Sequence, residues 1–160
     1  MRQNPAGSSR WTRVSIPIGV GFFLFALAVS AFYVPQLRLL HVLQAMIYVA
    51  ILVLTRRNSP WGFGIGVIIP TAWNCLNLFV THLFQKGAGQ FWLMIHAGHV
   101  SKPDTLMVMV GCVAHFLLMV ACMAGFLQLQ PRGKQWGQFF GGGIPALAYF
   151  ALIIAIAGPR

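Results

Sequence analysis

The stretch WGFGIGVIIPTAWNCLNLFVTHLF, residues 61–84, is long and apolar enough to cross a lipid bilayer, and it decides the fold class. It contains no Asp, Glu, Lys or Arg, and a helix of about 20 apolar residues crosses the hydrocarbon core. Four further runs of this kind accompany it. The sequence therefore predicts an all-α integral membrane protein, a five-span transmembrane helical bundle with spans at 14–34, 37–54, 61–84, 106–127 and 139–157.

These runs predict one transmembrane domain over residues 14–157, preceded by a short N-terminal segment of residues 1–13. Residues 85–104 form a long connection, whose apolar, Trp92-bearing part is typical of a segment lying in the membrane interface. The fifth run starts with glycines at 141–143. Because glycine disfavours helix, we expect that helix to begin near Ile144.

The composition also requires a membrane, because 58% of the residues are apolar and 8% are charged. Soluble domains have about 45–50% and about 25%, respectively. The net charge of +10 comes from basic residues scattered over loops, which indicates contact with anionic lipid headgroups rather than nucleic-acid binding. The expected partners are therefore the lipid bilayer and other membrane protein subunits, with no nucleic acid.

The distribution of Lys and Arg predicts the orientation of the chain. Seven basic residues fall on one side of the membrane and four on the other, so the positive-inside rule puts the N-terminus in the cytoplasm and the C-terminus outside, in a bacterial inner membrane. The first run also resembles a cleavable signal peptide, and cleavage would leave four spans. The first group is Arg2, Arg10, Arg13, Arg56, Arg57, Arg132 and Lys134; the second is Arg38, Lys86, Lys102 and Arg160.

Asp104 is the only Asp or Glu in the chain. A chain with one carboxylate cannot use paired-carboxylate catalysis or an Asp/Glu proton relay. The sequence therefore favours a non-enzymatic role without deciding the question. Asp104 follows Pro103 where the fourth span starts, which predicts a helix N-cap. A second interpretation is that its carboxylate orients a histidine on the same side of the membrane.

Polar side chains recur on one face of the second and third predicted helices. The depth of each residue can be counted from the outer membrane edge, because a helix rises about 1.5 Å per residue. By this count Tyr48 lies level with Asn74, and Gln44 lies level with Asn77. His115 in the fourth span reaches the level of Tyr48 and Asn74. We therefore expect a polar seam in the outer half of the bundle, with the candidate binding residues His41, Gln44, Tyr48, Asn74, Asn77, His82 and His115.

Two interpretations of this seam remain open. Hydrogen bonds between helices would stabilise the bundle by roughly 0.6–2 kcal/mol each. Alternatively, the seam lines a pocket for haem b, a quinone or a lipid headgroup, and Pro70 would bend the third helix to open it. In that pocket Tyr48, Asn74 and His115 would hydrogen-bond a carbonyl-bearing ring. His41 and His82 would supply opposed imidazoles to a haem iron.

His96 and His99 form a second candidate site, for zinc or copper. They are three residues apart and would share a face if residues 85–104 were helical. The alternative is that both are solvated histidines at the membrane interface.

Three functions fit the sequence. We favour an accessory or assembly subunit that acts through helix packing within a larger membrane complex, because the chain is small and has no catalytic constellation. The alternative is an electron-transfer subunit that binds haem or quinone at the polar seam. A transporter for a small solute or a metal is third, because no predicted span carries an acid to couple transport to an ion gradient.

Overall fold

The computed structural model describes residues 9–129 and 135–157, and these residues form an all-α bundle. Within them, five helical segments are long and apolar enough to cross a membrane, which confirms the predicted fold class. They are α1 (Arg10–Tyr33), the 3-10 turn η1 (Pro35–Leu37) with α2 (Arg38–Arg56), α3 (Pro60–Cys75) with the π-helix η2 (Leu76–Val80), α5 (Pro103–Gln128) and α6 (Gln135–Ala157). The remaining helix is α4 (Leu83–Ala97).

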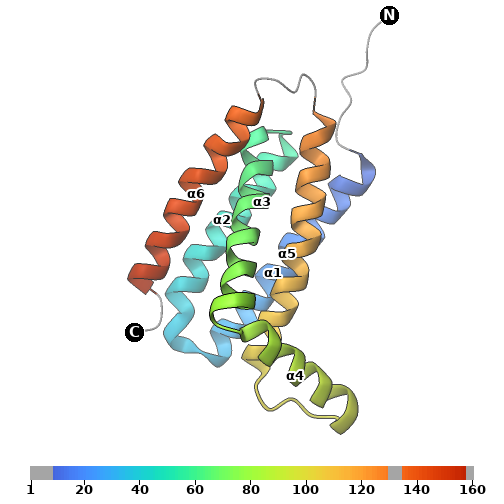
Figure 1. The fold of residues 1–160 in the computed structure, drawn as a ribbon, viewed down its shortest axis with the longest axis vertical. Coiled ribbons are helices and arrows are strands. Elements are labelled where there is room, and N and C mark those ends of the chain that lie inside the picture. Colours follow the sequence, from blue (N-terminus) through green and yellow to red (C-terminus); the bar gives the residue numbers. More distant parts are fainter. Residues whose placement is uncertain (1–8, 130–134, 158–160) are drawn as a thin grey trace, which may run out of the picture.

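The spanning helices run up and down the bundle, and α4 projects obliquely from one end of it (Figure 1). Helix α1 packs mainly on α5, α3 packs on α6 and α5, and α4 packs on α5. We call the end where α1 begins and α2 turns into α3 the N-terminal end. The opposite end, where α4 lies and α5 begins, is the α4 end.

The predicted third span is too long, because the π-helix that extends α3 ends at Val80. His82 then adopts a left-handed backbone conformation with φ 54°. A non-glycine residue rarely takes this conformation inside a helix, so the chain changes direction here. Residues 85–104, expected as an interfacial loop, consist largely of helix α4.

The glycines at 141–143 lie inside α6, so the expected helix start near Ile144 is wrong. A Cβ atom on Gly142 would lie 2.6 Å from the carbonyl oxygen of Trp61 in α3. The two backbones can approach this closely only because no side chain intervenes. The tertiary contact therefore offsets the low helix propensity of glycine.

Asp104 does not occupy the predicted N-cap position, because the N-cap of α5 is Lys102. Pro103 is the first residue of the helix, a position that suits its fixed φ angle and missing N–H. Asp104 therefore lies in the first turn, where a carboxylate still interacts favourably with the helix dipole.

Candidate functional site at the α4 end

Tyr48, Asn74 and His115 form a hydrogen-bonded triad between α2, α3 and α5. The Tyr48 hydroxyl lies 2.6 Å from Nε2 of His115, and Nδ1 of His115 lies 3.2 Å from Oδ1 of Asn74. The Asn74 amide nitrogen in turn donates to the carbonyl oxygen of Cys112 at 3.4 Å. The structure thus brings together the three residues that helix depth placed at one level.

The hydrogen bonds of the triad determine which of its atoms carry the protons. Because the Asn74 amide nitrogen donates to a carbonyl, its oxygen faces His115 and can only accept a hydrogen bond. Nδ1 of His115 therefore carries the proton, and Nε2 accepts from the Tyr48 hydroxyl. Both ring nitrogens of His115 are used within the protein.

Aromatic rings fill the space around the triad. The ring of Phe23 lies 4.1 Å from the ring of His115 and 4.2 Å from that of Tyr48, centroid to centroid. Trp73 meets His115 edge-on at 4.7 Å. His115 is 0% exposed and Tyr48 1% exposed. The triad is therefore a closed, packed region of the bundle.

Towards the α4 end, the bundle contains a cavity of about 400 Å³. Its wall is formed by helices α1, α2, α3, α5 and α6, by the π-helix η2, by Leu83 at the start of α4 and by the turns beside them. Apolar side chains, among them Phe23, Leu40, Trp73 and Ile154, form much of the lining. The polar lining residues are Ser30, His41, Gln44, Asn77, Thr81, Asp104 and Thr105.

His41 lines the cavity and has a ring nitrogen whose hydrogen-bonding capacity is not used by the residues that the structure describes. The residue is 9% exposed, and its Nδ1 atom is buried without a hydrogen-bond partner in the part of the chain that the structure describes. Asn77 differs, because its amide nitrogen donates to the Trp73 carbonyl oxygen at 2.9 Å and its oxygen accepts from Thr81 at 3.4 Å. A buried, unpaired ring nitrogen costs free energy, so His41 is a candidate contact for a ligand in the cavity.

The π-helix η2 forms one wall of the cavity, through Leu76 and Asn77. Single π-helical turns inside α-helices often occur at functional sites. Sequence analysis did not find this feature. The nearest sequence signal was Pro70, which lies six residues before the first residue of η2.

The structure divides the candidate binding residues into three sets. Tyr48, Asn74 and His115 form the triad, and His41, Gln44 and Asn77 line the cavity. His82 is exposed and is not a lining residue. The structure therefore does not bring His41 and His82 into one cavity, as bis-histidine haem ligation would require.

His96 and His99 do not share a helical face as proposed. Helix α4 ends at Ala97, and Gly98 takes a left-handed conformation with φ 67°, so His99 lies beyond the helix. Both histidines are exposed, and the His96 ring stacks on Trp92 at 3.7 Å. Among the described residues, no group of three or more His, Cys, Asp or Glu is placed to hold a metal ion.

Two parts of the cavity wall were not indicated by the sequence. Asp104 was assigned to a helix cap, whereas it lines the cavity. Phe150 and Ile154 of α6 also line it, although the fifth span carries no polar stripe that could have marked them.

Comparisons of the chain with protein-family models, with curated proteins and with solved structures found no match. The chemistry of the cavity must therefore be inferred from the residues that line it.

Proposed function

We propose that the protein is a membrane subunit that binds a small amphipathic molecule of the quinone class in the cavity at the α4 end. The observation that carries this proposal is that His41 lines a 400 Å³ cavity and that its buried Nδ1 atom has no hydrogen-bond partner among the described residues. An apolar cavity with a few polar groups is typical of small-molecule sites.

The lining residues suit a carbonyl-bearing ring. A quinone oxygen accepts hydrogen bonds, and the His41 imidazole and the Gln44 amide can donate them. The apolar lining, including Leu40 and Trp73, would contact the ring and its tail. Haem fits less well, because His82 lies outside the cavity and both ring nitrogens of His115 are used in the triad.

The proposed orientation puts this cavity on the outer side of a bacterial inner membrane, with the N-terminus in the cytoplasm. In the described part of the chain, Arg10, Arg13, Arg56 and Arg57 lie at the N-terminal end. Arg38, Lys86 and Lys102 lie at the α4 end. The excess at the N-terminal end supports this orientation through the positive-inside rule.

Quenching of Trp73 fluorescence tests the proposal directly, because Trp73 lines the cavity. A short-chain benzoquinone titrated into the detergent-purified protein should quench part of the tryptophan emission in a saturable way. The variant Trp73→Phe should lose that component and keep the emission of the other four tryptophans.

The variant His41→Leu should weaken quinone binding about fivefold, which corresponds to one hydrogen bond of about 1 kcal/mol. Thr71→Val is a matched control, because Thr71 is exposed and bonds only its own helix. Quenching that does not saturate, or that is equal in His41→Leu and the wild type, would contradict the proposal.

An accessory role within a larger complex is the second candidate, and one feature of α6 favours it. Gly137 has no atom within 4 Å of an added Cβ, and Gly141 has only a distant one. Ala151 and Ala155 farther along α6 are also exposed. Small residues four apart let a second membrane helix approach closely.

Substitution of these alanines tests the accessory role. Ala151→Leu combined with Ala155→Leu should abolish co-purification of any other subunit present in fixed ratio with the wild type. Gly21→Leu is the control, because Gly21 of α1 also faces open space. Equal loss in both variants, or no subunit in fixed ratio, would count against this role.

A further inference from the structure

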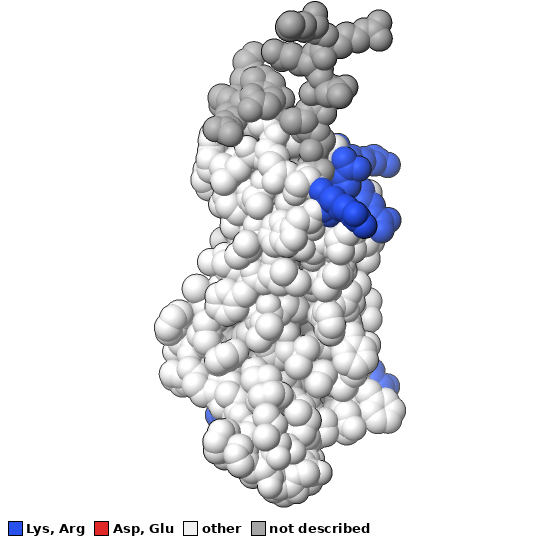
Figure 2. All heavy atoms as spheres, turned by 90° about the vertical axis from the view of Figure 1, so that its right-hand side faces the viewer, with Lys and Arg blue, Asp and Glu red and all other residues white. Residues whose placement is uncertain are grey.

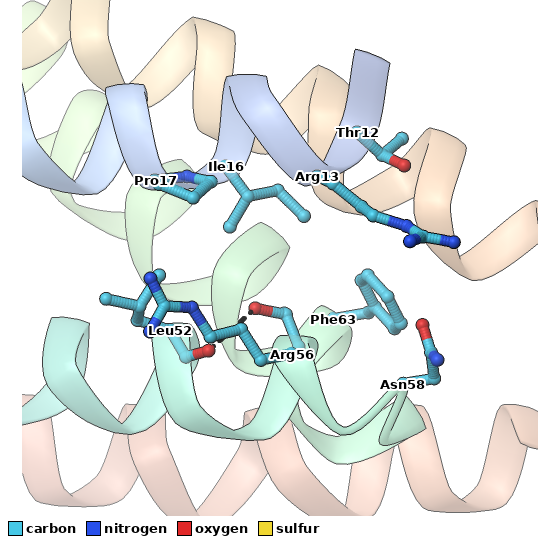
Figure 3. Close-up of a pocket in the computed structure, with 9 residues that line it drawn as sticks. Thr12, Arg13, Ile16, Pro17, Leu52, Arg56, Asn58 and Phe63 are labelled. Carbon is cyan, nitrogen blue, oxygen red and sulfur yellow. Dashed lines mark hydrogen bonds between the residues drawn. The ribbon is translucent and has the colours of Figure 1, made fainter. Parts of the chain in front are cut away.

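The cavity at the α4 end differs in charge from a second cavity, of about 350 Å³, at the N-terminal end. The second cavity is lined by Arg13 and Arg56, whose side chains point towards different ends of the gap between α1 and α2 (Figure 3). Figure 2 shows Lys and Arg side chains gathered near the N-terminal end. Asp104, the only Asp or Glu of the chain, lines the cavity at the α4 end. The one side-chain carboxylate therefore belongs to the wall of the proposed binding cavity.

Three residues in this wall, Thr81, Asp104 and Thr105, have no side-chain proton left to donate. The Thr105 hydroxyl donates to a carboxylate oxygen of Asp104 at 3.4 Å. The Thr81 hydroxyl lies 3.4 Å from the Leu76 carbonyl oxygen and 3.4 Å from Oδ1 of Asn77, and its one proton is used there. A carboxylate carries no proton, and a hydroxyl carries one. Towards a ligand, these three side chains therefore offer hydrogen-bond acceptors.

The α2 side of the cavity supplies hydrogen-bond donors. His41 and Gln44 belong to this helix, and an imidazole ring and an amide can each donate. On η2, Asn77 also keeps one amide hydrogen, because its bond to the Trp73 carbonyl oxygen uses the other. Helices α1 and α3 each pack on both α2 and α5, so α2 and α5 face each other across the cavity. The donors on α2 thus lie opposite the acceptors at the start of α5.

We propose that the cavity selects the reduced, hydroxyl-bearing form of its ligand, a quinol, over the quinone. One ring hydroxyl donates to Asp104, and the oxygen at the other end of the ring accepts from His41 or Gln44. A quinone has only acceptor oxygens, so its oxygen beside Asp104 would meet a second acceptor. This inference rests on the proposed function, because it names the form of the same ligand. Asp104 is then the residue that determines specificity.

Calorimetric titration of the detergent-purified protein under anaerobic conditions tests the proposal. The ligands are a short-chain benzoquinol, the matching benzoquinone, and the dimethyl ether of the quinol, which keeps both ring oxygens but has no O–H donor. We expect the quinol to bind about tenfold more tightly than either of the others. Tenfold corresponds to about 1.4 kcal/mol, close to the lower limit for a hydrogen bond to a charged group. A preference of less than threefold in the wild type overturns the proposal without the need for any variant.

Asp104→Asn should reduce the preference for quinol to about twofold or less, because an amide offers a donor as well as an acceptor. The matched control is Lys102→Gln, which removes a charge two residues before Asp104 at an exposed position that does not line the cavity. It should leave the preference within twofold of the wild type. A preference that persists in Asp104→Asn, or that falls equally in Lys102→Gln, contradicts the assignment of Asp104.

His41→Leu separates this inference from the proposed function. It should weaken quinol and quinone binding alike, because both ligands present an oxygen that accepts from His41. If the two forms bind the wild type equally and both depend on His41, the cavity is a quinone-class site and only the assignment of the reduced form is wrong. If neither form binds, the proposed function is wrong and this inference is wrong with it.

Discussion

The triad and the cavity at the α4 end come from the same polar stripes, yet they differ in how their hydrogen bonds are used. In the triad, both ring nitrogens of His115 have protein partners, and the residue is fully buried. In the cavity, Nδ1 of His41 has no partner among the described residues. A polar residue in a membrane helix can thus have all its hydrogen bonds satisfied within the bundle or leave one of them unused.

The two regions should therefore respond oppositely to loss of their histidines. Removing a triad residue leaves buried partners unpaired, and this costs stability. Removing His41 eliminates an atom that is already unpaired, so the cost should appear in binding instead.

His115→Ala should have the largest effect, lowering the free energy of unfolding by about 3 kcal/mol. The change breaks two hydrogen bonds and leaves a void beside Phe23 and Trp73. Reversible unfolding in mixed detergent micelles measures it. Val113→Ala, at an exposed position of the same helix, should change stability by less than about 0.5 kcal/mol. A similar small change for His115→Ala would mean that the triad is not a stabilising unit.

Tyr48→Phe should lower the free energy of unfolding by about 1.5 kcal/mol, because Nε2 of His115 loses its donor. Tyr149→Phe is the same substitution at a long, 3.4 Å hydrogen bond to the Leu43 carbonyl oxygen. That variant should be within about 0.5 kcal/mol of the wild type. If both variants changed the free energy of unfolding equally, the Tyr48 hydrogen bond would contribute no more to stability than the long Tyr149 bond does.

His41→Leu should raise the free energy of unfolding by about 1 kcal/mol, because it removes a buried nitrogen that has no partner in the described part of the chain. The same variant should bind the quinone probe less tightly. A gain in stability with a loss of binding is the trade-off expected of a functional position. If His41→Leu instead lowered the free energy of unfolding by more than about 1 kcal/mol, His41 would be a residue that stabilises the bundle, like those of the triad.

Asp104→Asn should have the smallest effect, a loss of about 0.5 kcal/mol, because only the interaction with the first turn of α5 is weakened. Raising the ionic strength should reduce the difference from the wild type. Unfolding measured at low and high salt checks both expectations. No difference at low salt would show that the carboxylate does not interact with the helix end.

The sequence predicted the five spans and the common level of Tyr48, Asn74 and His115, because helix rise is fixed and polar positions can be counted along it. It did not predict the helical glycines at 141–143, since these depend on close contacts between helices, and it did not predict the π-helix η2. The prediction that His96 and His99 share a helical face is wrong, because α4 ends before Gly98, which lies between them. The quinone ligand stays a prediction.

The contact between Gly142 and Trp61 is one of several close approaches that hold the first part of α6 against α3. It lies near the start of α3 and α6, while Ile154 lies in the wall of the cavity at the α4 end. At 1.5 Å per residue, the arm from Gly142 to Ile154 is about 18 Å long. A 5° tilt of α6 about this contact would move Ile154 by about 1.5 Å. Small rotations at the glycine contact would thus change the width of the cavity at the far end.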